Sequence, residues 1–212
     1  HIHDRRQRQM CIRDSNVGGG LGIRYTESDD PPSIDRWVQV VAEAVTKACR
    51  DRGLELPRLM CEPGRSLVAT AGVTLYSVGS RKTIPGIRTY VAIDGGMSDN
   101  PRPITYQSLY TCCLADRPLA AADETVNLVG KHCESGDVLL KDLPLPTTRT
   151  GDVVTVFATG AYNASMSSNY NRIPRPAAVV VKDGSSELVQ KREQPDDMLR
   201  YDVLPERFRA VR

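Results

Sequence analysis

The sequence predicts an α/β segment followed by a mostly antiparallel β domain. Between residues 16 and 66, a glycine loop and an amphipathic helix pattern lie between two short strand-like runs. After about residue 71, β-branched runs bounded by Gly, Pro and Asp replace the helical pattern. Asp183-Gly184, between two alternating runs, is a strong hairpin signal.

The first fifteen residues, HIHDRRQRQMCIRDS, differ from the rest of the chain. They are highly polar and follow neither the helical nor the strand period. We interpret residues 1–15 as a non-native, adapter-like segment and assign no function to His1, His3 or Cys11.

Residues 16–66 predict one parallel βαβ unit. The run NVGGGLGIRY is typical of a strand end that enters a glycine loop. Ser33 suits the N-cap of the following helix, and Gly53 suits its C-terminal end. One helix face collects the apolar residues Ile34, Trp37, Val38, Val41, Val45, Ala48 and Cys49. A short strand that ends at Glu62 and a Pro-Gly turn follow.

The β domain is predicted from four β-branched runs, TAGVTLYSVGSRK, RTYVAIDGG, GDVVTVFATGAY and PAAVVVKDGSSELVQKRE. A short helix is expected near PDDMLRY.

The composition favours a cytoplasmic protein without a nucleic-acid or membrane partner. The 212 residues carry a formal net charge of +2, which is too balanced for a nucleic-acid or membrane surface. No apolar run approaches the roughly 18 residues that span a bilayer. The six cysteines form no dense framework and no signal peptide is recognisable, which favours a reducing compartment.

The glycine loop matches neither a dinucleotide fingerprint nor a P-loop. What remains is three consecutive glycines at the end of a strand, where backbone N–H groups can approach a phosphate. The next strand ends in a second such loop, Glu62-Pro63-Gly64-Arg65. Two consecutive βα loops of this kind suit the phosphate site of a (β/α)8 barrel.

The stretch KHCESGD places a thiol, Cys133, beside a carboxylate, Glu134, before a turn. By themselves these residues predict only a loop with a packed cysteine and a solvated glutamate. Four residues, Cys112, Cys113, His132 and Cys133, offer possible zinc ligands, but both pairs are adjacent in sequence. Structural zinc sites favour ligands two to four residues apart, so we expect no metal site.

Five motifs together resemble, in order and spacing, the C-terminal half of the diaminopimelate decarboxylases: NVGGGLGIRY, CEPGRS, AIDGGMSDNPRP, KHCESGD and ATGAYNASMSSNYN. That family uses pyridoxal phosphate (PLP) and has an alanine-racemase-like barrel. The resemblance runs from Asn16 to near the C-terminus. It implies the terminal part of a PLP-binding (β/α)8 barrel in residues 16–70 and a mostly antiparallel β-barrel or sandwich domain in residues 71–212.

The resemblance also implies cofactor-binding residues. Gly20 would contact the cofactor phosphate, and the acidic Glu62 would face the pyridine nitrogen. A carboxylate there keeps the ring protonated and improves it as an electron sink. The implied PLP-binding set is Gly20, Glu62, Pro63, Gly64, Arg65 and Tyr162.

For the substrate, the resemblance implies residues that bind both amino-acid centres of diaminopimelate. Guanidinium groups suit its carboxylates because they pair with them bidentately. The implied substrate-binding set is Arg65, Arg102, Tyr106, Glu134 and Tyr162. Cys133 would be the catalytic acid that returns a proton after CO₂ loss. In the family, Cys133 and Glu134 act in the neighbouring active site of a homodimer.

The chain departs from the family in lacking the barrel lysine that bonds the cofactor and the histidine that lies against its ring. A full barrel needs about 250 residues, whereas only about 50 here have barrel character. We therefore expect a fragment that is inactive alone. Two alternatives stay open: a related decarboxylase of ornithine, arginine or carboxynorspermidine, and a non-catalytic β-domain interaction protein. SDNPRP with CESGD favours decarboxylation of diaminopimelate to lysine, the last step of lysine biosynthesis.

Overall fold

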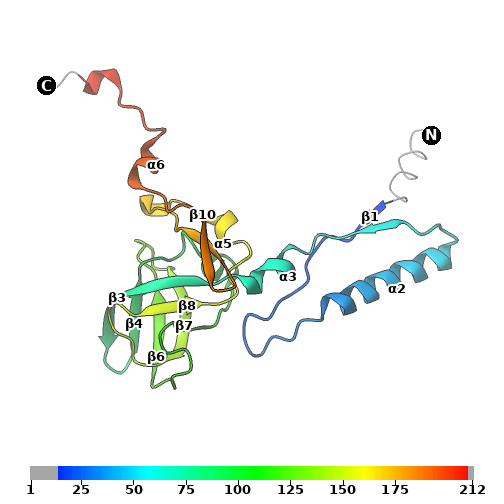
Figure 1. Cartoon of the computed structure of the whole chain (residues 1–212), viewed down its shortest axis with the longest axis horizontal. Coiled ribbons are helices and arrows are strands. Elements are labelled where there is room, and N and C mark those ends of the chain that lie inside the picture. Colours follow the sequence, from blue (N-terminus) through cyan, green and yellow to red (C-terminus); the bar gives the residue numbers. More distant parts are fainter. Residues whose placement is uncertain (1–13, 210–212) are drawn as a thin grey trace. The chain divides into compact units, whose positions relative to one another are not determined.

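The computed structural model describes residues 14–209 (Figure 1). These residues form two compact units. The first unit contains the described chain up to Thr74, Tyr110–Cys112 and Val156–Tyr162. The second contains Leu75–Leu109, Cys113–Thr155 and residues 163–209. Within the described range, the helices are too short or too polar to cross a bilayer.

The first unit contains the predicted βαβ arrangement. Strand β1 (Asp14–Asn16) pairs in parallel with β2 (Arg58–Met60), and helix α2 (Ile34–Arg52) connects them. Strand β1 includes two residues, Asp14 and Ser15, of the segment expected to be non-native. Helix α3 (Gly64–Val68) and the 3-10 turn η1 (Ala69–Ala71) follow where the sequence predicted only a turn.

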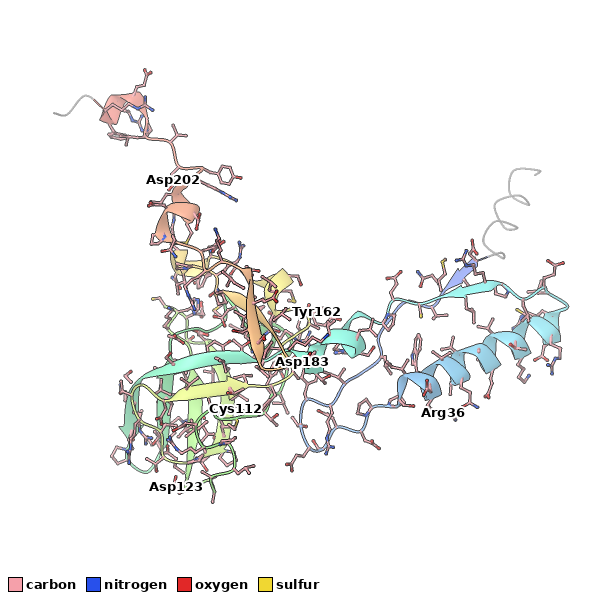
Figure 2. The ribbon with its side chains drawn as sticks, in the orientation of Figure 1. Arg36, Cys112, Asp123, Tyr162, Asp183 and Asp202 are labelled. Atoms are coloured by element: carbon pink, nitrogen blue, oxygen red, sulfur yellow. The ribbon has the colours of Figure 1, made fainter. Side chains whose placement is uncertain are left out.

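Both predicted ends of α2 are confirmed. The Ser33 hydroxyl oxygen accepts a hydrogen bond from the backbone N–H of Arg36, which lies in the first turn of α2 (Figure 2). Gly53 takes the left-handed conformation at φ 62° that ends the helix. Cys49 is the one buried residue of α2, whereas Ile34 is 43% exposed and Val38 48% exposed. Two residues of the predicted apolar face are therefore exposed, whereas Trp37, Val41, Val45 and Ala48 are partly buried.

A six-stranded sheet, most of it in the second unit, has the strand order β5-β8-β3-β4-β6-β7. Its strands are β3 (Thr74–Ile84), β4 (Arg88–Ile93), β5 (Cys112–Leu114), β6 (Glu124–Val129), β7 (Val138–Leu145) and β8 (Val153–Val156). The prediction of a β domain is confirmed, but β5, β6 and β7 were not among the predicted runs. The sheet buries Val78, Val91, Leu114, Leu128, Val154 and Val156.

The sheet is mixed. Strand β4 pairs antiparallel with β3 but parallel with β6, from Thr89↔Val126 to Ala92↔Val129. Strand β7 returns antiparallel beside β6. The carboxyl ends of β4 and β6 consequently lie at the same edge of the sheet, which determines where the loops that follow them emerge.

The predicted hairpin is also confirmed. Strands β9 (Ala178–Lys182) and β10 (Ser185–Gln190) pair antiparallel, and Asp183 lies at the turn between them (Figure 2). Asp183 and Gly184 both have positive φ, 51° and 76°, as a type I′ turn requires. The remaining short elements are α4 (Arg102–Tyr106), α5 (Asn163–Met166), η2 (Tyr170–Arg172), α6 (Pro195–Leu199) and η3 (Glu206–Phe208).

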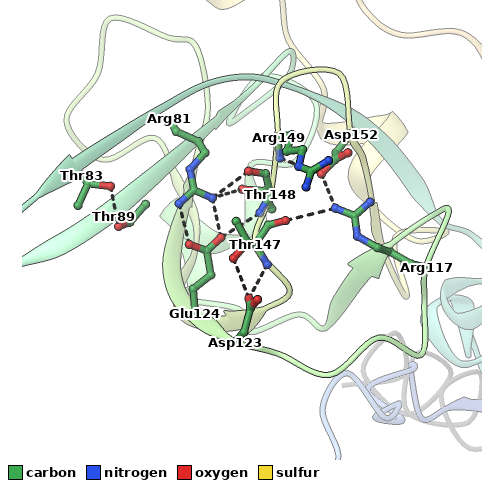
Figure 3. A network of polar contacts seen from close by, with 10 residues as sticks. All are labelled: Arg81, Thr83, Thr89, Arg117, Asp123, Glu124, Thr147, Thr148, Arg149 and Asp152. Atoms are coloured by element: carbon green, nitrogen blue, oxygen red, sulfur yellow. Dashed lines mark hydrogen bonds and ion pairs between the residues drawn. The ribbon is translucent and has the colours of Figure 1, made fainter.

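A polar network joins strands and loops of the second unit (Figure 3). The Arg81 guanidinium donates to both carboxylate oxygens of Glu124 at 2.7 Å and to the Thr148 carbonyl at 3.0 Å. These hydrogen bonds from Arg81, with that from the Thr148 N–H, hold the pKa of the Glu124 carboxyl below its ordinary value against the opposing effect of burial. Glu124 therefore stabilises the fold in its charged form.

We predict that Glu124→Gln lowers the free energy of unfolding by about 1.5 kcal/mol near neutral pH, because it removes a hydrogen-bonded charge. The folded pKa of Glu124 lies below the unfolded value near 4.5. The loss is therefore fully present above that pH and disappears as the pH falls through the folded pKa. Urea unfolding at several pH values measures the difference. Glu187→Gln on the exposed strand β10 is the matched control. A loss that is equal at neutral and at acidic pH would contradict the prediction.

We predict that residues 16–70 are the first part of the 212-residue chain to be digested, and the part that promotes aggregation. The sheet in this segment has two strands, β1 and β2, and Ile34 and Val38 of α2 are exposed. Limited proteolysis followed by mass spectrometry should leave a protected core from the six-stranded sheet. Recovery of an intact, protease-resistant 16–70 segment would contradict this.

Candidate functional site

Two loops of the first unit are hydrogen-bonded to each other where β1 and β2 end. The Glu62 N–H donates to the Gly18 carbonyl at 2.7 Å. The Asn16 side-chain amide donates to the Glu62 carboxylate at 2.5 Å, and its oxygen accepts from the Gly18 N–H at 2.8 Å. The structure thus brings the two predicted loops together, because parallel neighbours end at the same edge.

Glycines are required on the first of these loops for two different reasons. A Cβ atom on Gly19 would overlap the Glu62 carbonyl oxygen, so the two backbones approach too closely for a side chain. Gly18 and Gly20 have φ values of 71° and 87°, which other residues rarely adopt. Gly20 is exposed, and an added Cβ would meet no atom within 4 Å. Its bare backbone is therefore open to a ligand that accepts hydrogen bonds, such as a phosphate.

Arg65 lies in the first turn of α3 and is partly buried. Its Nε is buried and has no hydrogen-bond partner among residues 14–209. A buried guanidinium nitrogen without a hydrogen-bond partner costs free energy. Arg65 therefore suits a ligand that brings an acceptor, such as a carboxylate or a phosphate.

The segment that carries Tyr162 is tied to the chain just after α3. The Gly160 N–H donates to the Ala69 carbonyl at 3.0 Å, and the Thr159 N–H donates to the Gly72 carbonyl at 3.0 Å. A Cβ on Gly160 would overlap the Val68 carbonyl oxygen. Ala69 and Ala161 share a small buried cluster with Ile23 and Ala158. These contacts fix the backbone that leads to the Tyr162 ring.

Tyr162 itself is 43% exposed and has a left-handed backbone, with φ 72°. Such a conformation is uncommon for a tyrosine and costs about 1 kcal/mol or more, so it is held by the surrounding contacts. Gly20, residues 62–65 and Tyr162 all belong to the first unit.

The other predicted residues lie in the second unit, on loops that follow β4 and β6. Since these strands are parallel neighbours, both loops emerge at one edge of the sheet. The Lys131 N–H donates to the Gly95 carbonyl at 3.1 Å, and the Met97 N–H donates to an Asp137 carboxylate oxygen at 2.7 Å. Residues 94–101 and 130–137 are therefore in direct contact.

Arg102 and Tyr106 lie one turn apart on α4, as the sequence predicted for a helical segment. Arg102 is buried, and its guanidinium carbon lies 5.5 Å from the centre of the exposed Tyr106 ring. Its Nη2 donates to the Ser108 hydroxyl at 3.3 Å. A buried cation held against an aromatic face is well suited to bind a carboxylate.

Cys133 and Glu134 lie exposed on the loop after β6. The Cys133 N–H donates to the Asn171 side-chain oxygen at 3.3 Å. In the same loop, a Cβ on Gly136 would lie 2.7 Å from the Ile104 side chain, so the loop packs against α4. The loop that carries Cys133 and Glu134 is thus in contact, through Gly136, with the helix of Arg102 and Tyr106.

Three polar residues of these sites were missed in the sequence. Asn16 connects the two loops of the first unit, and Asp137 was interpreted only as a turn residue. The third is Asp99. Burial raises the pKa of its carboxyl, although Tyr76 donates a hydrogen bond to it and the Gly96 N–H donates at 2.8 Å. No local signal identified Asn16 and Asp137, because their partners Glu62 and Met97 lie 46 and 40 residues away in the sequence. Between residues 14 and 209, His, Cys, Asp and Glu side chains form no group of three that could hold a metal ion.

Comparison with known proteins gives consistent matches. Residues 11–160 match the family model "Pyridoxal-dependent decarboxylase, C-terminal sheet domain". A diaminopimelate decarboxylase of Synechocystis sp. is 59% identical over 199 residues, which cover 94% of this chain and 42% of that protein. The diaminopimelate decarboxylase of Bacillus subtilis is 52% identical over 89% of this chain and 43% of its own length.

A solved structure agrees with these matches. The crystal structure of a diaminopimelate decarboxylase from M. jannaschii in complex with L-lysine has a TM-score of 0.85 and is 34% identical. The match covers 96% of this chain and 46% of the M. jannaschii chain. The family match includes both groups of residues described above, apart from Tyr162. The chain therefore belongs to the pyridoxal-dependent decarboxylases, of which it contains the C-terminal sheet domain.

Proposed function

We propose that this chain is the C-terminal portion of a diaminopimelate decarboxylase. The complete enzyme would convert meso-2,6-diaminopimelate to L-lysine and CO₂. The chain spans less than half the length of the relatives named above. We propose that residues 16–70 are the last part of a (β/α)8 barrel, that residues 71–212 are the β domain, and that residues 1–15 are not native. The portion alone is inactive, because the lysine that bonds the cofactor belongs to the other half.

The observation that carries this proposal is the meeting of two loops at the shared edge of β4 and β6. One loop leads to a buried arginine, Arg102, and the other presents a thiol and a carboxylate, Cys133 and Glu134. Diaminopimelate has an amino-acid centre at each end, so its enzyme needs cations for carboxylates and an anion for the distal ammonium. These residue types meet that need when two copies of the chain combine, since Cys133 and Glu134 would serve the neighbouring active site.

The residues of the first unit fit pyridoxal phosphate. The exposed backbone of Gly20 and the residues Glu62, Pro63, Gly64 and Arg65 would hold it, with the Glu62 carboxylate at the ring nitrogen and the Tyr162 ring beside it. The open backbone at Gly20 and the unpartnered Nε of Arg65 support this fit. When bound, pyridoxal phosphate takes up the electron pair left on the α-carbon as CO₂ departs.

The residues of this chain would do the remaining work. Arg65, Arg102, Tyr106 and Tyr162 orient the substrate through its carboxylates, and Glu134 pairs with the distal ammonium. Cys133 delivers a proton to the α-carbon from which CO₂ has left, and the thiolate recovers its proton from water. We further propose a cytoplasmic homodimer in which Cys133 and Glu134 serve the neighbouring active site.

The test joins this chain to the part of the Synechocystis relative that precedes the matched region. With PLP, the completed enzyme should release CO₂ from meso-diaminopimelate. Arg102→Ala should lower kcat/KM on the order of 100-fold, because the substrate carboxylate loses its buried cationic partner. Arg172→Ala is the control, since that arginine is exposed and paired with Asp202. Turnover of ornithine or arginine instead of diaminopimelate would contradict the proposed substrate.

A second prediction concerns the cofactor loops. Gly19→Ala in the completed enzyme should raise the Kd for PLP about tenfold or more, which corresponds to roughly 1.4 kcal/mol, because its Cβ forces the Glu62 loop away. Gly22→Ala is the matched control, since its Cβ would lie at an ordinary 3.5 Å from Pro31. Titration of PLP followed by its visible absorbance measures both. Equal Kd values for the two variants would contradict the assignment of this loop.

A further inference from the structure

We infer that Asp137 is a positioning residue, which holds the loop of Cys133 and Glu134 in place and fastens it to the loop that leads to Arg102. The role assigned to the thiol rests on the proposed function, whereas the fastening rests on geometry alone. Asp137 is 4% exposed, and both of its carboxylate oxygens already accept hydrogen bonds from backbone N–H groups of the protein.

The Asp137 carboxylate gathers three donors from two loops. One oxygen accepts from the His132 N–H at 3.0 Å and lies 2.7 Å from Nδ1 of the His132 ring. The other oxygen accepts from the Met97 N–H at 2.7 Å. The first two contacts close the loop that carries Cys133 and Glu134, and the third crosses to the loop after β4. A single side chain therefore determines the shape of one loop and its attachment to the other.

The space around this carboxylate is built from backbone. A Cβ on Gly130 would overlap the carboxylate, and a Cβ on Gly96 would lie 2.5 Å from one of its oxygens. The absence of side chains at these two glycines thus leaves room for the Asp137 carboxylate. The close fit keeps the carboxylate in one orientation, in which each oxygen faces its own donors.

Further contacts hold the rest of the loop. The His132 ring stacks on Tyr170, with centroids 5.9 Å apart and planes 14° apart. The Cys133 N–H is held by Asn171, and the Asp137 N–H donates to the Glu134 carbonyl at 3.1 Å. The backbone of Cys133 and Glu134 is fixed on both sides, while their side chains stay exposed. This is the arrangement expected for groups that must meet a reacting atom.

Asp137→Asn tests the role with almost no change of shape. A carboxamide has one acceptor oxygen, so its NH₂ must face either Met97 N–H or the two donors of His132. One attachment is lost whichever way the amide turns. Asp183→Asn is the matched control, because it makes the same chemical change at an exposed turn where asparagine is well tolerated.

The first measurement is amide hydrogen exchange of the 212-residue chain by NMR. In Asp137→Asn, the N–H of Met97 or of His132 should exchange about tenfold faster or more than in Asp183→Asn, whereas core amides of β4 should not change. Unchanged protection at both sites would overturn the inference. This outcome does not depend on the substrate of the complete enzyme.

The second measurement is a double-mutant cycle in the completed enzyme. Asp137→Asn should lower kcat on the order of 100-fold, because Cys133 is displaced, and raise KM for diaminopimelate, because Glu134 is displaced. Cys133→Ala should strongly lower turnover while PLP absorbance remains. Adding Asp137→Asn to Cys133→Ala should lower kcat no further, since the aspartate acts through the thiol.

The outcomes separate the inference from the proposed function. If the two losses in kcat multiply, or if KM is unchanged in Asp137→Asn, the aspartate serves only the stability of the fold and the inference is overturned. If the parent enzyme does not release CO₂ from diaminopimelate, the proposed function fails, and hydrogen exchange alone decides whether Asp137 fastens the loops.

Discussion

Parallel hydrogen bonding between β4 and β6 is the constraint on which the second unit depends. An antiparallel partner would send the loop after β6 to the opposite edge of the sheet, far from the loop after β4. With the parallel pair, the segments that carry Arg102 and Cys133 emerge side by side and can share a carboxylate, Asp137. The direction of the strands thus places the two loops next to each other, and the side chains of the loops then make the contacts between them.

The two units contribute different parts of the proposed reaction. The first contributes glycine backbone, the Glu62 loop and Tyr162, which suit a phosphorylated cofactor. The second contributes Arg102, Cys133 and Glu134, which suit the two ends of a diamino dicarboxylate. In both units two neighbouring parallel strands deliver their loops to one edge, although one pair is short and exposed and the other is part of a buried sheet.

Features that depend on local sequence could be predicted, and features that depend on distant pairing could not. The Ser33 cap and the Asp183-Gly184 turn are confirmed because each is determined by a few adjacent residues. Strand β6 was missed because its run is short and contains the polar Asn127, which is buried in the sheet. Its parallel register with β4 depends on residues more than thirty positions away, and so the role of Asp137 had no signal within its own loop.

The candidate site follows the same division. The resemblance of five motifs to a known family proposes Cys133, Arg102 and the Glu62 turn as site residues, whereas Cys133 and Glu134 by themselves predict only a loop. Asn16 carried no signal, since its partner Glu62 lies 46 residues further along the chain.

The backbone contact between Gly72 and Gly160 has a consequence for how such a protein can diverge. A side chain on either glycine would overlap the backbone of the other segment. A change at one position cannot be rescued by a change at the other, since neither has a side chain left to shorten. Neither position can therefore accept a side chain unless the backbone shifts. The contact constrains the shape of the backbone at this point of the fold and contributes no chemical group to a site.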